Sequence, residues 1–274
     1  MPRALDGSKD RSAPELVVAG VFGPLSDRLA RALASLGAPP VAVVLANSAA
    51  GIAAAVAIQQ GALVLAALLL QVKTLLDNTD GRLARVSGRV SLLGRYLDTE
   101  ADLVVNALVF TALGAATGAP WLAVAAFCAL TLVLSVGFNF DEVHRDVHHR
   151  SARRPARSGG AVERALEGMY RVVFAPQDRV LRTLWSRRLA RLLQGEADAD
   201  RRRNATLAYY DPGTAAILAN LGLSTQLVVL GVCLVAGAPA LYLWLVLGSA
   251  ALLPLLQLRR ERLVRRALRP RLEA

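Results

Sequence analysis

The chain has 274 residues, of which 54% are hydrophobic, and it carries a formal net charge of +11. A mean hydropathy of +0.41 excludes an ordinary soluble domain, and the charges are concentrated outside three long stretches. Residues 41–72, 103–140 and 212–258 contain no Asp, Glu, Lys or Arg. Because the basic residues flank these apolar stretches, we interpret them as groups that bind anionic lipid and exclude a nucleic-acid-binding protein. The two cysteines, Cys128 and Cys233, fall inside the stretches and show neither a disulfide framework nor a metal-ligand spacing.

The N-terminal residues predict two different segments. Residues 1–14 are polar and charged, so we expect them to be disordered and to lack a signal peptide. Residues 15–37 are amphipathic and predict a juxtamembrane helix on the membrane surface, broken near Gly23-Pro24. One face of this helix carries Leu25, Leu29, Leu33 and Leu36. Gly37 is expected to end the helix, and Pro39-Pro40 to begin the first membrane span.

Each of the three uncharged stretches is long enough for two membrane helices, because a helix that spans a bilayer needs about 20 residues. The sequence therefore predicts three helical hairpins and six spans, with uncharged turns near Gly61, Gly118 and Gly237. After the first span, the expected spans are 61–82, 91–116, 120–138, 212–235 and 239–257. Lys and Arg gather at the ends opposite the turns, so both termini are predicted to be cytoplasmic. Polar Asn47 and Ser48 in the first span are interpreted as hydrogen-bonding groups between helices.

Between the first two hairpins lies a charged segment with the spacing D-x2-D-G-x2-A-R-x8-G-x3-D-x3-D. Its fixed positions are Asp77, Asp80, Gly81, Ala84, Arg85, Gly94, Asp98 and Asp102. The first two aspartates are three residues apart and the last two are four apart, so each pair shares one face of a helix. A turn around Gly88 would bring the two pairs together.

Four carboxylates in one place would repel one another strongly unless cations neutralise them. Carboxylate oxygens favour hard ions such as Mg2+ or Mn2+, and these ions in turn bind phosphates. Gly81 leaves the backbone open to a bulky phosphorylated ligand, and the guanidinium group of Arg85 can bind a phosphate. A solvated helix end with surface salt bridges is the alternative interpretation. It is disfavoured because Asp102 adjoins a long uncharged stretch, where a carboxylate without a function is costly.

The eight positions resemble the signature of the CDP-alcohol phosphotransferase family, also called CDP-alcohol phosphatidyltransferases. These membrane enzymes transfer a substituted phosphoryl group from a CDP-linked donor to an alcohol hydroxyl and release CMP. The resemblance implies a homodimer and two Mg2+ or Mn2+ ions, with Asp77, Asp80 and Asp98 as main ligands. It implies that Asp102 is a further ligand and the general base. For the remaining positions it implies that Gly81, Ala84 and Gly94 leave room for the nucleotide and that Arg85 holds phosphate.

One departure from the family lies at the start of the first span. Many members have Pro-Asn and a nearby Thr near the nucleotide, whereas this chain has Pro39-Pro40-Val41. The sequence therefore does not identify the residues that would contact cytidine.

The donor and the acceptor are also open. CDP-diacylglycerol is the expected donor in phospholipid biosynthesis, and the excess of arginine favours an anionic acceptor such as glycerol 3-phosphate. Inositol, inositol phosphate or another alcohol remain alternatives. A non-catalytic bundle that binds cations or lipid is a hypothesis of another class, but it would not require Gly94 and Arg85.

Residues 141–211 predict a basic cytoplasmic insertion between the fourth and fifth spans. It begins with all three histidines, His144, His148 and His149. The first two could form a metal site with Asp141 on one helical face, although a polar helix end is the favoured interpretation. A flexible linker is expected at residues 151–160, followed by two amphipathic stretches separated by Pro176. The apolar face of the second carries Val180, Leu181, Leu184, Trp185, Leu189, Leu192 and Leu193. Membrane-surface binding is expected for both stretches, and an acceptor pocket made by their arginines is the alternative.

The last hairpin should begin at Asp211-Pro212, an N-cap residue followed by proline. Residues 259–274 form a basic tail that is expected to lie against the inner leaflet. Together, residues 1–274 predict one all-α domain in the inner membrane, with six transmembrane helices, interfacial amphipathic helices, and the aspartate motif on the cytoplasmic side.

Overall fold

The computed structural model describes residues 12–90, 92–148 and 175–269, and these residues form helices without any strand. The elements are η1 (Val18–Phe22), α1 (Gly23–Ser35), α2 (Pro40–Gln59), α3 (Leu63–Val86), α4 (Leu92–Thr117), α5 (Pro120–Val147), α7 (Ala175–Leu192), α8 (Ala199–Tyr209), α9 (Pro212–Asn220), α10 (Leu223–Val235) and α11 (Pro239–Ala267). The predicted all-α fold is confirmed.

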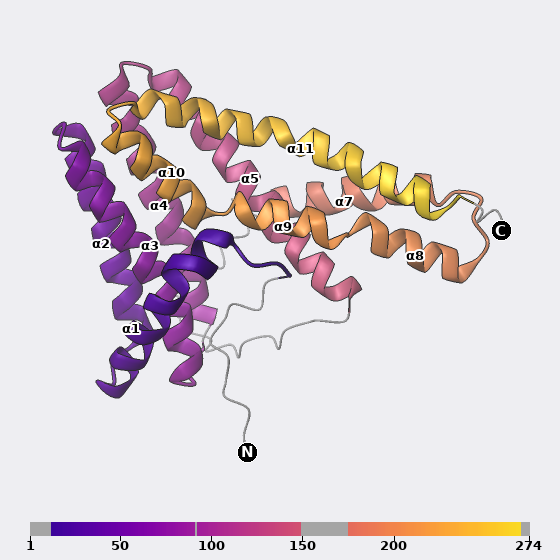
Figure 1. The fold of residues 1–274 in the computed structure, drawn as a ribbon, viewed down its shortest axis with the longest axis horizontal. Helices are drawn as coiled ribbons and strands as arrows, with labels where there is room; N and C mark the ends of the chain where they lie inside the picture. Colours follow the sequence, from indigo (N-terminus) through magenta and orange to yellow (C-terminus); the bar gives the residue numbers. More distant parts are fainter. Residues whose placement is uncertain (1–11, 91, 149–174, 270–274) are drawn as a thin grey trace.

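Helices α2, α3 and α4 form one group, in which α2 packs against both of the others (Figure 1). α1 crosses α3 on one side, and α10 packs along α3 on another. The core of this group contains many small residues, among them Ala54, Ala66 and Ala112, which are fully buried. Small side chains allow the helix backbones to approach closely, which is the usual basis of packing between membrane helices.

Within the described residues, five helical stretches are long and apolar enough to cross a membrane. They are Pro40–Gln59, Leu97–Thr117, Pro120–Val147, Ala199–Val235 and Pro239–Ala267. The chain is therefore a multi-pass membrane protein. α3 is not among the five because its second half carries charged residues, including Lys73 and Asp77. α3 nevertheless forms a hairpin with α2, as the sequence predicts. Because α3 is not among the five stretches, its crossing of the membrane as a sixth span stays a prediction.

The predicted hairpin turns coincide with the ends of the helices, but the fifth span differs from its prediction. The helix expected over 212–235 is divided into α9 and α10, with Gly222 extended at φ −65° and ψ 167°. The Glu15 carboxylate accepts hydrogen bonds from the backbone N–H of Thr225 at 2.7 Å and from its hydroxyl at 2.8 Å. A distant residue therefore caps α10, which is why no local signal predicted the break.

The N-terminal segment also differs in two details. Asp141 accepts a hydrogen bond from the backbone N–H of Ser12 at 2.7 Å, and Ala13 is buried. The expected disorder of residues 1–14 is therefore wrong for these two, because they pack against α5 and its neighbours. At Gly23-Pro24 the helix does not break. It changes there from the π-helical turn η1 to α1.

A second group of helices contains α7, α8 and the end of α11, which lie on the side of α5 away from α2 and α3 (Figure 1). In this group α7 packs against α5, and α8 packs against α11. Arg260 of α11 is only 3% exposed, and its guanidinium carbon lies 3.9 Å from the ring centroid of Tyr209. The same group lies 4.8 Å from the ring centroids of Phe140 and Trp185. The expectation that the tail lies wholly against the leaflet is therefore wrong at Arg260, since an aromatic cage buries it.

Candidate active site

The site is built where α3 ends and α4 begins. Gly88 lies between the two helices at φ +67°, a conformation that favours glycine. The backbone N–H of Arg89 donates to the Ala84 carbonyl oxygen at 2.9 Å, which closes the end of α3. This turn reverses the chain, as predicted, so that the second half of the motif returns toward the first.

Three carboxylates meet between α3 and α4. Asp77 from α3 and both Asp98 and Asp102 from α4 each offer an oxygen, and these atoms all lie within 4.8 Å of one another. Asp77 is 8% exposed, and the other two are half-buried. Within the described part of the chain, this is the only such group of three or more metal-ligating side chains. The predicted gathering of both halves of the motif therefore holds for three of its four aspartates.

The fourth aspartate and the other motif residues lie on the same two helices. Asp80 is buried on α3, one turn after Asp77, and it does not belong to the group of three. Gly81, Ala84 and Arg85 follow on the last turns of α3, whereas Gly94 lies in the first turn of α4.

A lysine that the sequence analysis did not single out also reaches this site. The Nζ atom of Lys73 donates to Asp102 Oδ1 at 2.5 Å and to Asn47 Oδ1 at 3.2 Å. Its side chain is 0% exposed. A signal was present in the sequence, because the chain has two lysines among its 32 basic residues and only Lys73 lies in an apolar helix. It also precedes Asp77 by four residues and so shares its face.

The polar residues of the first span have different partners. Asn47 accepts its hydrogen bond from α3, so its predicted role between helices is confirmed. The Ser48 hydroxyl instead donates to the Val44 carbonyl oxygen of its own helix at 2.8 Å. For Ser48 the prediction is wrong, because a serine in a helix can bond to the carbonyl one turn earlier.

Residues between the motif positions fix α3 against its neighbours. The Asn78 amide donates to the Ser224 hydroxyl of α10 at 3.2 Å. Arg82 forms an ion pair with Asp27 of α1. Together with the Lys73 contacts to α2 and α4, these bonds hold the carboxylate-bearing face of α3 from several sides.

The donor set fits a hard divalent cation. Asp77, Asp98 and Asp102 carry three negative charges, and Lys73 contributes one positive charge, which leaves about two negative charges on the group. All three possible ligands are carboxylate oxygens, the ligand type that Mg2+ and Mn2+ prefer.

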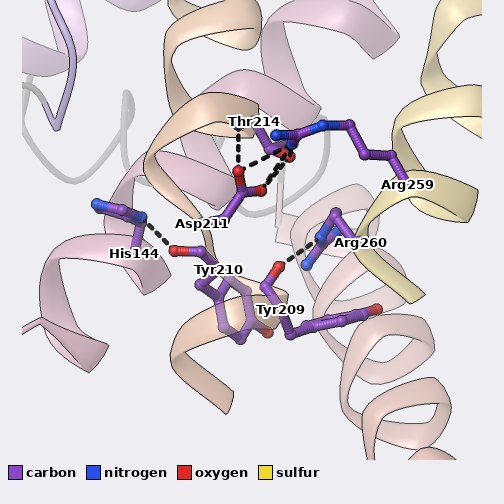
Figure 2. A network of polar contacts seen from close by, with 7 residues as sticks. All are labelled: His144, Tyr209, Tyr210, Asp211, Thr214, Arg259 and Arg260. Atoms are coloured by element: carbon purple, nitrogen blue, oxygen red, sulfur yellow. Dashed lines mark hydrogen bonds and ion pairs between the residues drawn. The ribbon is translucent and has the colours of Figure 1, made fainter. Parts of the chain in front are cut away.

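The histidine segment is engaged in a different way. His144 Nδ1 lies 2.6 Å from the Tyr210 carbonyl oxygen (Figure 2), and His148 Nδ1 lies 2.9 Å from the His144 carbonyl oxygen. Asp141 instead bonds Ser12. Among the described residues these side chains do not form a group that could hold a metal ion, and the polar helix end stays the favoured prediction. His149, the linker and the first amphipathic stretch lie outside the described residues.

The comparison with known families agrees with the motif. Residues 38–161 match the sequence model of the CDP-alcohol phosphatidyltransferase family, slightly less than half of the chain. The match runs from the start of α2 beyond α5 and contains all eight motif positions. No curated protein and no solved structure matches the chain.

Proposed function

The chain carries a CDP-alcohol phosphatidyltransferase domain over residues 38–161, and from this premise we propose the reaction in detail. The domain transfers a phosphatidyl group to an alcohol. Our proposal is that CDP-diacylglycerol is the donor, that a small alcohol is the acceptor, and that CMP leaves. The observation that carries the proposal is the meeting of Asp77 with Asp98 and Asp102 from the other half of the motif.

The three carboxylates would hold the divalent ions that the family implies, with Asp80 one turn further along α3. When bound, Mg2+ or Mn2+ would neutralise the donor diphosphate and the charge that develops on the departing CMP.

The protein's own residues would then have separate tasks. The acceptor oxygen forms a bond to the phosphatidyl phosphorus while the bond from that phosphorus to the CMP oxygen breaks. Asp102 receives the proton of the acceptor hydroxyl. Arg85 binds a phosphate oxygen, and the small residues Gly81, Ala84 and Gly94 leave room for the nucleotide.

For the acceptor we propose glycerol 3-phosphate ahead of inositol, inositol phosphate and other alcohols, because the cytoplasmic segment is rich in arginine. Several of these arginines already have acidic partners. Arg182 pairs with Glu142, and Arg188 pairs with Glu261. An acceptor pocket would therefore use other arginines. We further propose that the protein is a homodimer and that its active site faces the cytoplasm.

The test is CMP release by the purified protein in lipid vesicles with CDP-diacylglycerol and a panel of alcohols. We expect one acceptor to support release with Mg2+ or Mn2+ and a chelator to abolish it. If no combination of donor and acceptor releases CMP while the folded protein still binds Mn2+, the non-catalytic cation-binding bundle is the better account.

A further inference from the structure

The side chain of Lys73 packs against a glycine of the neighbouring helix α2. A Cβ atom added to Gly51 of α2 would clash with Val105 Cγ1 of α4, and it would also lie 3.1 Å from Lys73 Cδ and 3.3 Å from Lys73 Cε. The apolar part of the lysine side chain therefore runs along the bare backbone at Gly51. This contact directs the ammonium group to the space between α2, α3 and α4.

The ammonium group then meets one residue from each of the other two helices. Asn47 of α2 and Asp102 of α4 both accept hydrogen bonds from it. Asp102 is the more exposed partner of the ion pair, with 18% of its side chain accessible, whereas Lys73 has none. The buried ammonium group thus fixes a carboxylate that still faces solvent.

Two physical consequences follow for Asp102. A carboxylate with one oxygen held by an ammonium group cannot turn freely, so the direction of the carboxylate is set by α2 and α3. The positive charge of Lys73 also weakens the attraction of the three clustered carboxylates for other cations, because it already neutralises part of their negative charge. The Lys73 charge also attracts Asp77 and Asp98, but its strongest attraction is to Asp102, to which it is hydrogen-bonded.

We propose that Lys73 is a positioning residue for Asp102. It holds this carboxylate at the orientation in which it receives the acceptor proton, and its charge makes Asp102 the weakest of the three metal ligands, so that metal ligation falls mainly to Asp77 and Asp98. The proton-transfer part rests on the proposed function. The effect of the Lys73 charge on cation binding does not, so the two can be tested separately.

The first measurement is the affinity of the full-length protein in detergent for Mn2+, determined from the electron paramagnetic resonance signal of free Mn2+. We expect Lys73→Met to bind Mn2+ about tenfold more tightly than the wild type, because a positive charge leaves the site. A purely structural lysine would give the opposite result, since distortion of the site loosens metal binding. Gln71→Met is the matched control, because Gln71 also lies on α3 but its amide contacts the Leu227 carbonyl oxygen of α10. The control should keep the wild-type affinity.

The second measurement is CMP release with radiolabelled donor. We expect Lys73→Met to lower kcat by about tenfold or more with KM for the donor nearly unchanged, because a misdirected base slows the chemical step. In the Asp102→Asn background, the Lys73→Met change should cause no further loss, since both residues act through one carboxylate. Lys73→Gln keeps hydrogen-bond donors without the charge. It should tighten Mn2+ binding like Lys73→Met, and it gives the same comparison if Lys73→Met does not fold.

Unchanged or weaker Mn2+ binding in both folded Lys73 variants would overturn the proposal. So would a loss of kcat that is as large in the Asp102→Asn background as in the wild type, because Lys73 would then act elsewhere. If the wild type releases no CMP with any substrate, the proposed function fails, whereas the Mn2+ comparison still decides whether the Lys73 charge opposes cation binding.

Discussion

At the scale of single residues, the aspartates of the motif differ in their surroundings. Asp77 is almost buried and lies on α3, whereas Asp102 is half-buried on α4 and is tied to Lys73. Residues of the same type can therefore have different tasks at one site, because burial and a neighbouring cation change what a carboxylate can bind.

This difference predicts separable effects of two isosteric substitutions. Asp77→Asn should weaken Mn2+ binding by about tenfold or more, because it removes a buried ligand charge. Asp102→Asn should bind Mn2+ more tightly than Asp77→Asn does but lose about 10²-fold to 10⁴-fold in kcat, since an amide cannot accept the proton. Mn2+ titration and CMP release measure the two effects.

Asp27→Asn is the control for both substitutions, because it makes the same chemical change at a residue that pairs with Arg82 outside the carboxylate group. Its metal affinity should match the wild type. Wild-type turnover in Asp102→Asn would contradict the assignment of the base.

The sequence predicts the gathering of these carboxylates well and their neighbours poorly. Spacing within one helix places Asp98 and Asp102 on one face, and a glycine turn brings that face back toward Asp77. The contact of Lys73 with Asn47 depends instead on which sides of α2 and α3 meet. That choice is made by packing at positions such as Gly51, where spacing along either helix gives no information.

At the scale of helices, α11 shows how one cation can organise several elements. Arg260 touches rings from α5, α7 and α8, and its Nε donates to the Tyr209 carbonyl oxygen at 2.9 Å (Figure 2). Its neighbour Arg259 is half-buried and donates to both carboxylate oxygens of Asp211 at 2.9 Å. Adjacent arginines in the predicted tail therefore have a buried and a surface role.

We expect Arg260→Ala to destabilise the docking of α8 on α11 by about 3 kcal/mol, the sum of a buried cation–π contact and a hydrogen bond from a charged donor. Arg260→Lys should lie between this variant and the wild type, because an ammonium group lacks the planar fork. Hydrogen exchange of the α8 amides, or limited proteolysis near residue 196, measures the loss.

Arg262→Ala provides the comparison, because Arg262 is exposed on the same helix and should leave exchange in α8 unchanged. Equal protection of α8 in Arg260→Ala and the wild type would show that the aromatic cage does not hold α8.

At the scale of the whole molecule, the membrane explains why the helices could be predicted and their arrangement could not. An uncharged stretch must form helices in lipid, because no water is present to satisfy the backbone. The division of the fifth span follows from the distant carboxylate of Glu15, and the position of α7 and α8 follows from contacts with α5 and α11. Neither has a periodic signal in the sequence.

The orientation in the membrane gives the last prediction. The turn at Gln60 lies between two apolar helix ends, whereas the turn at Val90 lies between the two halves of the motif and next to basic residues in the sequence. Because Lys and Arg favour the cytoplasmic side, these two turns should lie on opposite sides of the membrane.

After replacement of Cys128 and Cys233, a membrane-impermeant maleimide added to intact cells should label Gln60→Cys. Val90→Cys should be labelled only after permeabilisation, because a nucleotide-linked donor made inside the cell must reach that side. Labelling of Val90→Cys in intact cells, with protection of Gln60→Cys, would place the carboxylates outside and remove the donor that the proposed reaction requires.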